Sequence, residues 1–181
     1  MHREMMLSKT YQLSSEATTD KDNRLLWRAN VRERLDVEAL RDSILAVAGT
    51  LDLTVGGASR PLTDTFARRA IYATVSRSKP DRMMALFDFP DPNASSEQRI
   101  VTVGPMQRLF FMNSPFVAAQ AKALAGRLAG VGIEGAYELL YSRPATAEEI
   151  RLGREFLGGD TAKWPQYAQV LLSAAEFSTV K

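Results

Sequence analysis

The sequence predicts a mainly α-helical globular domain of several helices, with at most a small two-stranded β element. Along much of the chain, and most clearly in its last third, apolar residues recur every three or four positions, which is the period of a helix with one buried face. Capping residues or proline precede several of these stretches, and glycine or proline follows them, as at helix ends. The 181 residues are 45% hydrophobic and 24% charged, which is typical of one globular domain with a single core.

The N-terminal part, residues 1–113, is predicted to combine helices with long loops. Residues 3–13 are expected to form a short helix, and residues 14–23 a polar loop. The side chains of this first helix that are expected to face a core are Met6, Leu7 and Tyr11. A stronger helix begins near Arg34 and ends at Gly49. Its apolar stripe comprises Val37, Leu40, Ile44, Val47 and Leu51.

The middle of the chain is predicted to be irregular. Residues 50–65 contain Gly56-Gly57 and Pro61, which interrupt regular structure. Residues 71–75 and 100–103 are β-branched and apolar, as strands are. These two segments could pair antiparallel and close the loop between them.

The C-terminal part, residues 114–181, is predicted to form a helical unit that packs with the first part into one globular domain. Ser114-Pro115 begins a helix that ends at Gly130 and Gly132, and a second helix stops at Arg143-Pro144. Thr146 and Glu149 form a capping box for a third helix, and Pro165 lies in the first turn of a last helix. The connections are short, so neighbouring helices are expected to be antiparallel. The residues expected to be buried are Val117, Ala121, Leu124, Leu128, Ile133, Ala136, Tyr137, Leu140, Ile150, Gly153, Phe156, Leu157, Tyr167, Ala168, Leu171 and Leu172.

The composition argues against several kinds of chemistry. The chain has no cysteine, and its single histidine, His2, lies at the terminus. Thiolate nucleophiles, iron–sulfur ligation and multi-histidine metal sites are therefore excluded, so we expect no cofactor and no metal. The longest apolar runs are too short to span a membrane, and residues 1–15 lack the apolar core of a signal peptide.

Nucleic acid is not an expected partner. The net charge is only +2, from 23 basic and 21 acidic residues. One basic segment contains an aromatic residue, as nucleic-acid-binding segments do, but acidic residues flank it and cancel most of its field. This segment comprises Arg24, Trp27, Arg28, Arg32 and Arg34.

A first polar group lies on the predicted helix near Arg34. Spacings of three, four and seven residues place most of its members on one helix face, namely Arg34, Glu38, Arg41 and Asp42. The group could form an anion site or a docking surface. The favoured interpretation is a solvated ladder of ion pairs, because such patterns are common on exposed helix faces.

A second polar group surrounds a proline-rich loop and comprises Asp88, Asp91, Asn93, Arg99, Gln107 and Asn113. Paired carboxylates could perform acid–base chemistry or bind a hard cation. The favoured interpretation is that these side chains lock the loop by hydrogen bonds. We expect Arg99 to pair with Asp88 or Asp91, because a carboxylate carried near apolar surface needs a partner. The candidate binding residues are Arg41, Asp88, Asp91, Arg99, Gln107 and Asn113.

Several motifs resemble a known family in order and spacing from about Leu7 to Val180. They include Asp22-Asn23-Arg24-Leu25-Leu26-Trp27, residues 34–42, Phe87-Asp88, Pro90-Asp91-Pro92-Asn93, Pro105-Met106-Gln107, Asn113-Ser114-Pro115-Phe116, Arg143-Pro144 and Glu176-Phe177. The chain resembles the C-terminal portion of a domain of unknown function found in planctomycete-type, cytochrome-c-associated exported multidomain proteins. It departs from that pattern at Lys9 and Gln12, in a short stretch between Gly57 and Arg69, and at Ala174-Ala175.

The resemblance implies a bacterial, extracytoplasmic setting in which companion domains, among them a cytochrome c-like domain, belong to the same longer chain. It carries over no catalytic residue. The expected function is a noncatalytic interaction or scaffolding module. The alternative is part of an extracytoplasmic enzyme that acts on polymeric or anionic substrates through the loop from Asp88 to Gln107.

Overall fold

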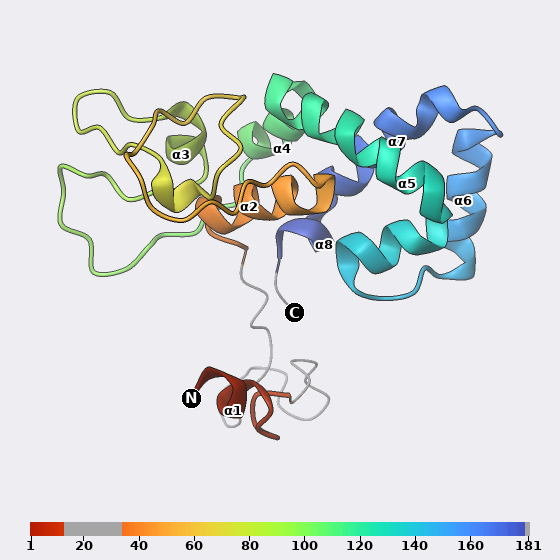
Figure 1. The fold of residues 1–181 in the computed structure, drawn as a ribbon, viewed down its shortest axis with the longest axis horizontal. Helices are drawn as coiled ribbons and strands as arrows, with labels where there is room; N and C mark the ends of the chain where they lie inside the picture. Colours follow the sequence, from red (N-terminus) through yellow and green to blue (C-terminus); the bar gives the residue numbers. More distant parts are fainter. Residues whose placement is uncertain (13–33, 180–181) are drawn as a thin grey trace. The chain divides into compact units, whose positions relative to one another are not determined.

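The structure, a computed structural model, describes residues 1–12 and 34–179 and is mainly helical (Figure 1). The chain divides into two compact units, Met1–Arg34 with Thr179–Lys181, and Leu35–Ser178. The predicted loop at residues 14–23 and the basic segment, apart from Arg34, lie outside the described residues. The predicted boundary at residue 113 falls inside the larger unit and stays a prediction.

The described helix of the smaller unit is shorter than predicted. Helix α1 spans His2–Met6, after which the Ser8 hydroxyl donates to the Met5 carbonyl and accepts from the Tyr11 N–H. Such local side-chain bonds compete with helix continuation. The expectation that this segment faces a core is wrong, because the exposed fractions of Met6, Leu7 and Tyr11 are 56%, 62% and 64%.

Helix α2 (Val37–Ala48) begins and ends close to the predicted positions. Val37, Leu40 and Ile44 are completely buried, which confirms most of the apolar stripe, whereas Val47 and Leu51 are half-buried and Leu51 lies beyond the helix end. Gly49 ends the helix with a φ of 75°, a left-handed conformation that glycine adopts without steric cost. Arg127 supports this end by donating to the carbonyl oxygens of Ala46 and Val47.

The segment between α2 and residue 104 is largely irregular, as predicted for residues 50–65. It contains the short 3₁₀ helix η1 (Ala70–Tyr72) and helix α3 (Arg82–Leu86). The Asp81 carboxylate caps α3 by accepting from the N–H groups of Met83 and Met84. Figure 1 shows these loops gathered at one end of the larger unit, opposite α6.

The predicted antiparallel pairing of residues 71–75 with residues 100–103 is wrong. Ala73 instead forms an isolated parallel bridge with Arg60. The described residues contain isolated bridges of this kind but no β-strand. Ile71 and Ile100 are each 72% exposed. β-Branched residues favour strands because their side chains pack well on a half-buried sheet surface. The side chains of these two segments are mostly exposed, so this preference does not act here.

The remaining helices form most of the core. They are α4 (Pro105–Asn113), α5 (Pro115–Tyr141), α6 (Ala147–Leu157), the 3₁₀ helix η2 (Thr161–Lys163), α7 (Trp164–Ser173) and α8 (Ala175–Ser178). Gly132, with a φ of 75°, breaks α5 at the predicted position. Helix α5 packs against α2 and α7, and α7 passes behind α5 in the view of Figure 1.

The predicted C-terminal core is largely confirmed. Val117, Leu124 and Leu128 are completely buried, as are Ala168 and Leu172 on α7. Phe156 is an exception, because 44% of it is exposed while its neighbour Leu157 is buried. Every helix in the described residues is too short or too polar to cross a membrane.

Candidate functional site

Asp88 and Gln107 lie together, as their place in one polar group suggested. Asp88 follows α3 with a φ of 64°. Its carboxylate accepts from the Thr102 N–H at 2.9 Å and the Thr102 hydroxyl at 2.8 Å. The buried Gln107 amide donates to the Leu86 carbonyl at 3.0 Å and to Asp88 at 3.4 Å. These bonds tie both ends of the loop to α4.

Arg99 does not pair with Asp88 or Asp91, so that prediction is wrong. Its guanidinium binds both carboxylate oxygens of Glu38 at 2.6 and 2.7 Å and lies 3.5 Å from the Asp36 carboxylate. Both acids stand at the N-terminus of α2, where negative charge stabilises a helix. The hydrogen bond from Arg99 lowers the pKa of Glu38, so this carboxylate is ionised and paired.

Asp91 and Asn113 have different surroundings from those of Asp88. The Asp91 carboxylate accepts from the Asn93 N–H at 2.9 Å and the Asn93 amide at 3.1 Å, which fixes a local turn. It also lines a cavity of about 290 Å³ that includes Phe89 and Pro90. Asn113 is the exposed last residue of α4. In the polar group from Asp88 to Asn113, Asp88 thus bonds to Gln107, Asp91 to Asn93, and Arg99 to Glu38.

Arg41 is the largest departure from the sequence-based interpretation. It is 2% exposed, so the solvated ladder of ion pairs is wrong for this residue. Its Nη2 donates to the carbonyl oxygens of Thr63 and Phe66 at 2.9 and 2.7 Å, and its guanidinium carbon lies 4.0 Å from the centroid of the Phe116 ring. Burial lowers the pKa of Arg41 to about 10.

A sequence signal for this burial exists. Arg41 lies four residues after Val37 and three before Ile44, so it belongs to the apolar face of α2. The neighbouring Asp42 also makes a contact within the fold: its carboxylate accepts a hydrogen bond from the Ala70 N–H at 2.7 Å. Glu38, Arg41 and Asp42 thus each hold a different loop segment against α2.

A second charged network joins three helices of the C-terminal half. Arg143, just after α5, donates to Glu149 of α6 at 2.8 and 3.0 Å and to Glu176 of α8 at 2.8 Å. The hydrogen bonds from Arg143 lower the pKa of Glu149 from 4.5 to about 2. Sequence reasoning singled out Glu149 only as a helix cap, because its pairing depends on how the helices meet.

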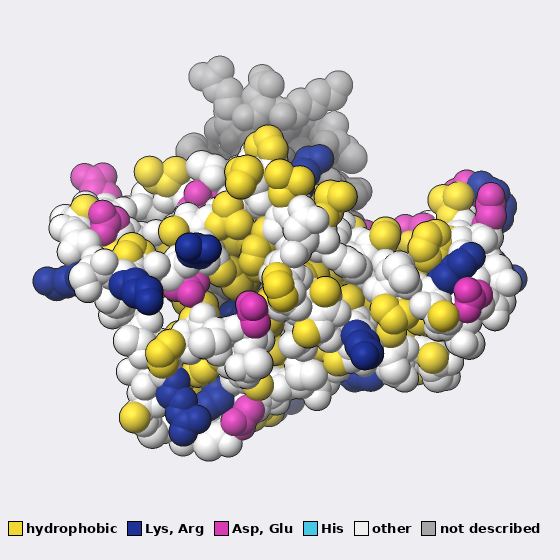
Figure 2. All heavy atoms as spheres, turned by 90° about the horizontal axis from the view of Figure 1, so that it is seen from above, with side chains coloured by type: hydrophobic (Ala, Val, Ile, Leu, Met, Phe, Trp, Pro, Cys, Tyr) yellow, Lys and Arg dark blue, Asp and Glu magenta, His cyan; other side chains and the backbone are white. Residues whose placement is uncertain are grey.

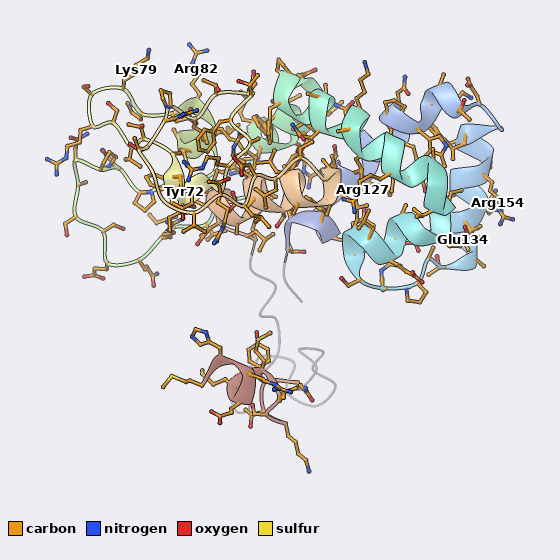
Figure 3. All side chains as sticks on the ribbon, in the orientation of Figure 1. Tyr72, Lys79, Arg82, Arg127, Glu134 and Arg154 are labelled. Atoms are coloured by element: carbon orange, nitrogen blue, oxygen red, sulfur yellow. The ribbon has the colours of Figure 1, made fainter. Side chains whose placement is uncertain are left out.

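Other charged side chains lie on the surface. Figure 3 shows Lys79 and Arg82 projecting outward at the loop end of the larger unit. At the other end Glu134 and Arg154 form an exposed ion pair of 3.2 Å. Within residues 1–12 and 34–179, no three His, Cys, Asp or Glu side chains are grouped so that they could hold a metal ion.

Comparison with known families gives one match. A family model described as "PSD1: Protein of unknown function (DUF1553)" matches residues 1–157. The matched range includes Arg41, the loop from Asp88 to Gln107 and the helices up to the end of α6. Neither the curated proteins nor the solved structures contain a match to this chain.

Proposed function

Because the chain belongs to the PSD1 family of proteins of unknown function (DUF1553), its role must be inferred from its own residues, and we propose a noncatalytic interaction module. It binds companion domains of the same longer chain through an apolar surface on α4. The motif resemblance described above supports an exported bacterial protein, with a cytochrome c-like domain among those companions.

The α4 surface is the observation that carries this proposal. We define it as Met106, Leu109 and Met112 of α4 together with Val103 just before the helix, with exposed fractions of 63%, 45%, 65% and 75%. The three α4 residues are spaced by three along the helix and so lie near one another. Other α4 residues, Gln107 and Phe111, are buried. A space-filling view shows a gathering of hydrophobic side chains on the middle of one face (Figure 2).

The chemistry of this surface fits another protein domain. Clustered exposed apolar side chains mark interaction surfaces, and methionine adapts to irregular partners. A polymeric anion would require a run of basic groups, whereas these four side chains are apolar. The partner that fits is therefore an apolar face of a companion domain.

The polar groups support a structural role. A general acid or base near neutral pH needs a pKa close to that pH, but pairing with Arg99 moves the pKa of Glu38 in the opposite direction. Asp88 and Gln107 are bonded to each other and to the loop that they close. This arrangement favours a module that binds over one that performs acid–base chemistry.

Methionine oxidation tests the proposal directly. Met106 and Met112 should react rapidly with hydrogen peroxide in the 181-residue chain, and slowly in the natural longer protein, where the companion domain covers them. The reaction at each methionine is followed by peptide mass spectrometry. The buried Met83 and Met84 serve as the slow reference. Equal oxidation of Met106 and Met112 in both proteins would contradict the proposal.

A charge substitution gives a second readout. Met106→Glu in the longer protein should restore rapid oxidation of Met112 by separating the two domains. Ile71→Glu is the matched control, because Ile71 is 72% exposed and lies outside the α4 surface. Slow oxidation of Met112 in both variants would show that another surface holds the domains together.

A further inference from the structure

A cavity beside Arg41 is separate from the α4 surface and unused by the proposed function. Its volume is about 380 Å³, within the range of small-molecule sites, roughly 300–1,000 Å³. It lies between α2, the loop at residues 62–64 and the start of α3. Its lining includes Arg41, Asp64, Asp81, Phe110 and Phe116.

Arg41 brings a buried and incompletely satisfied positive charge to this cavity. Its Nε has no hydrogen-bond acceptor within the described part of the chain, and Nη1 reaches only the Met83 sulfur, at 3.9 Å. Carbonyl oxygens satisfy Nη2, but no ion pair of Arg41 is found among the described residues. Asp42, Asp64 and Asp81 favour its charged form without forming an ion pair, and an acceptor that reached the guanidinium would add a charge-assisted hydrogen bond.

Besides Arg41, the cavity lining carries the positive charge of Arg82 and the negative charges of Asp64 and Asp81. Asp64 is exposed, and its carboxylate interacts electrostatically with Arg41. One oxygen of Asp81 caps α3. A simple anion would be attracted by Arg41 but repelled by these two carboxylates, whereas an ammonium group would be attracted to them. The charges therefore favour a ligand that bears both groups.

The remaining lining is mostly apolar and aromatic, with Thr63 and Arg82 as its polar members. Phe110 and Phe116 line the cavity together with Leu62 and Met83. We propose that this cavity binds a free amino acid with an apolar side chain. The ligand carboxylate meets Arg41, its ammonium group faces Asp64 and Asp81, and its side chain packs against Phe110 and Phe116.

Three related ligands test each part of this assignment on the 181-residue chain. L-Phenylalanine carries both charges, 3-phenylpropanoate lacks the ammonium group, and 2-phenylethylamine lacks the carboxylate. Binding is measured by titration calorimetry and by amide chemical-shift changes. We expect phenylalanine to bind and both analogues to bind about tenfold more weakly or worse, since each loses a charge-assisted contact. Equal binding of all three, or no binding of phenylalanine at millimolar concentration, would overturn the proposal.

Variants locate the site. Asp64→Asn removes a charge that interacts with Arg41 without a hydrogen bond, so phenylalanine binding should weaken, and urea denaturation checks that the fold is retained. Glu97→Gln makes the same charge change at an exposed residue outside the cavity and should leave binding unchanged. Unchanged binding in Asp64→Asn, or chemical-shift changes remote from Arg41 and Phe116, would also overturn the assignment. Because these readouts leave the α4 surface untouched, their failure is distinguishable from failure of the proposed function.

Discussion

Gly153 lies where α6 packs against α5 and α7. A β-carbon added at this buried position would lie 2.6 Å from the Tyr167 hydroxyl and 2.9 Å from Cδ1 of Ile133. Gly153→Ala should therefore lower the free energy of unfolding, by about 1–3 kcal/mol for overpacking of this kind. Urea denaturation monitored by circular dichroism measures the change.

Gly126 provides the matched control within α5. A β-carbon there meets nothing within 4 Å, so Gly126→Ala should raise the free energy of unfolding by about 0.5–1 kcal/mol through helix propensity alone. If both variants were stabilised alike, the close approach at Gly153 would not constrain the fold.

Residue-level predictions succeeded where the cause was local. Gly49 and Gly132 were identified as helix ends or breaks because only glycine adopts positive φ freely. The partner of Arg99 was not identified, because Glu38 lies 61 positions away and only the path of the loop brings the two together. Arg41 had a local signal, its place on the apolar stripe, but the general preference of arginine for the surface outweighed it.

The capping box of α6, which Thr146 begins, was also predicted correctly because its cause is local. Its hydroxyl accepts from the Glu149 N–H at 3.3 Å, and the Glu149 carboxylate accepts from the Thr146 N–H at 2.8 Å. Thr146→Ala should lower the free energy of unfolding by about 1 kcal/mol, because an N-cap bond is lost. The denaturation midpoint reports the change.

Thr161→Ala is the control for Thr146→Ala. Thr161 is exposed, and its hydroxyl makes no hydrogen bond with the described residues, so this substitution should change stability by less than about 0.5 kcal/mol. Equal midpoints for the two variants would show that the capping box contributes nothing.

Elements with strong boundary signals were predicted well, and those without them were not. Helices α2, α6 and α7 combine an apolar period with a stop or start signal. The five-residue helix α3 is too short to display a period. Residues 71–75 and 100–103 have strand-like composition but mostly exposed side chains, which the composition alone does not reveal.

Two sets of charges organise the larger unit as a whole. Glu38, Arg41 and Asp42 on α2 hold the loops of one end, while Arg143 joins the ends of α5, α6 and α8 in the other half. Most of these contacts join residues far apart in sequence, such as Arg99 with Glu38 and Arg143 with Glu176, although Arg143 and Glu149 are only six positions apart. The candidate site was therefore predictable in its residue types but not in its pairings.

The stability of the whole molecule should fall in acid because of these pairs. The pKa of Glu149 is lowered from 4.5 to about 2 by Arg143, and that of Glu38 is lowered by Arg99. Below about pH 5 the unfolded chain therefore binds more protons than the folded protein, and the free energy of unfolding decreases as the pH falls. The contribution of Glu149 is fully present at neutral pH and is lost between about pH 5 and pH 2.

Urea denaturation at a series of pH values measures this loss. Glu149→Gln should be less stable at pH 7 and show a flatter decline in acid, whereas Glu97→Gln, at an exposed position, should follow the parent chain. A Glu149→Gln profile parallel to that of the parent would show that Arg143 does not stabilise the fold through this carboxylate.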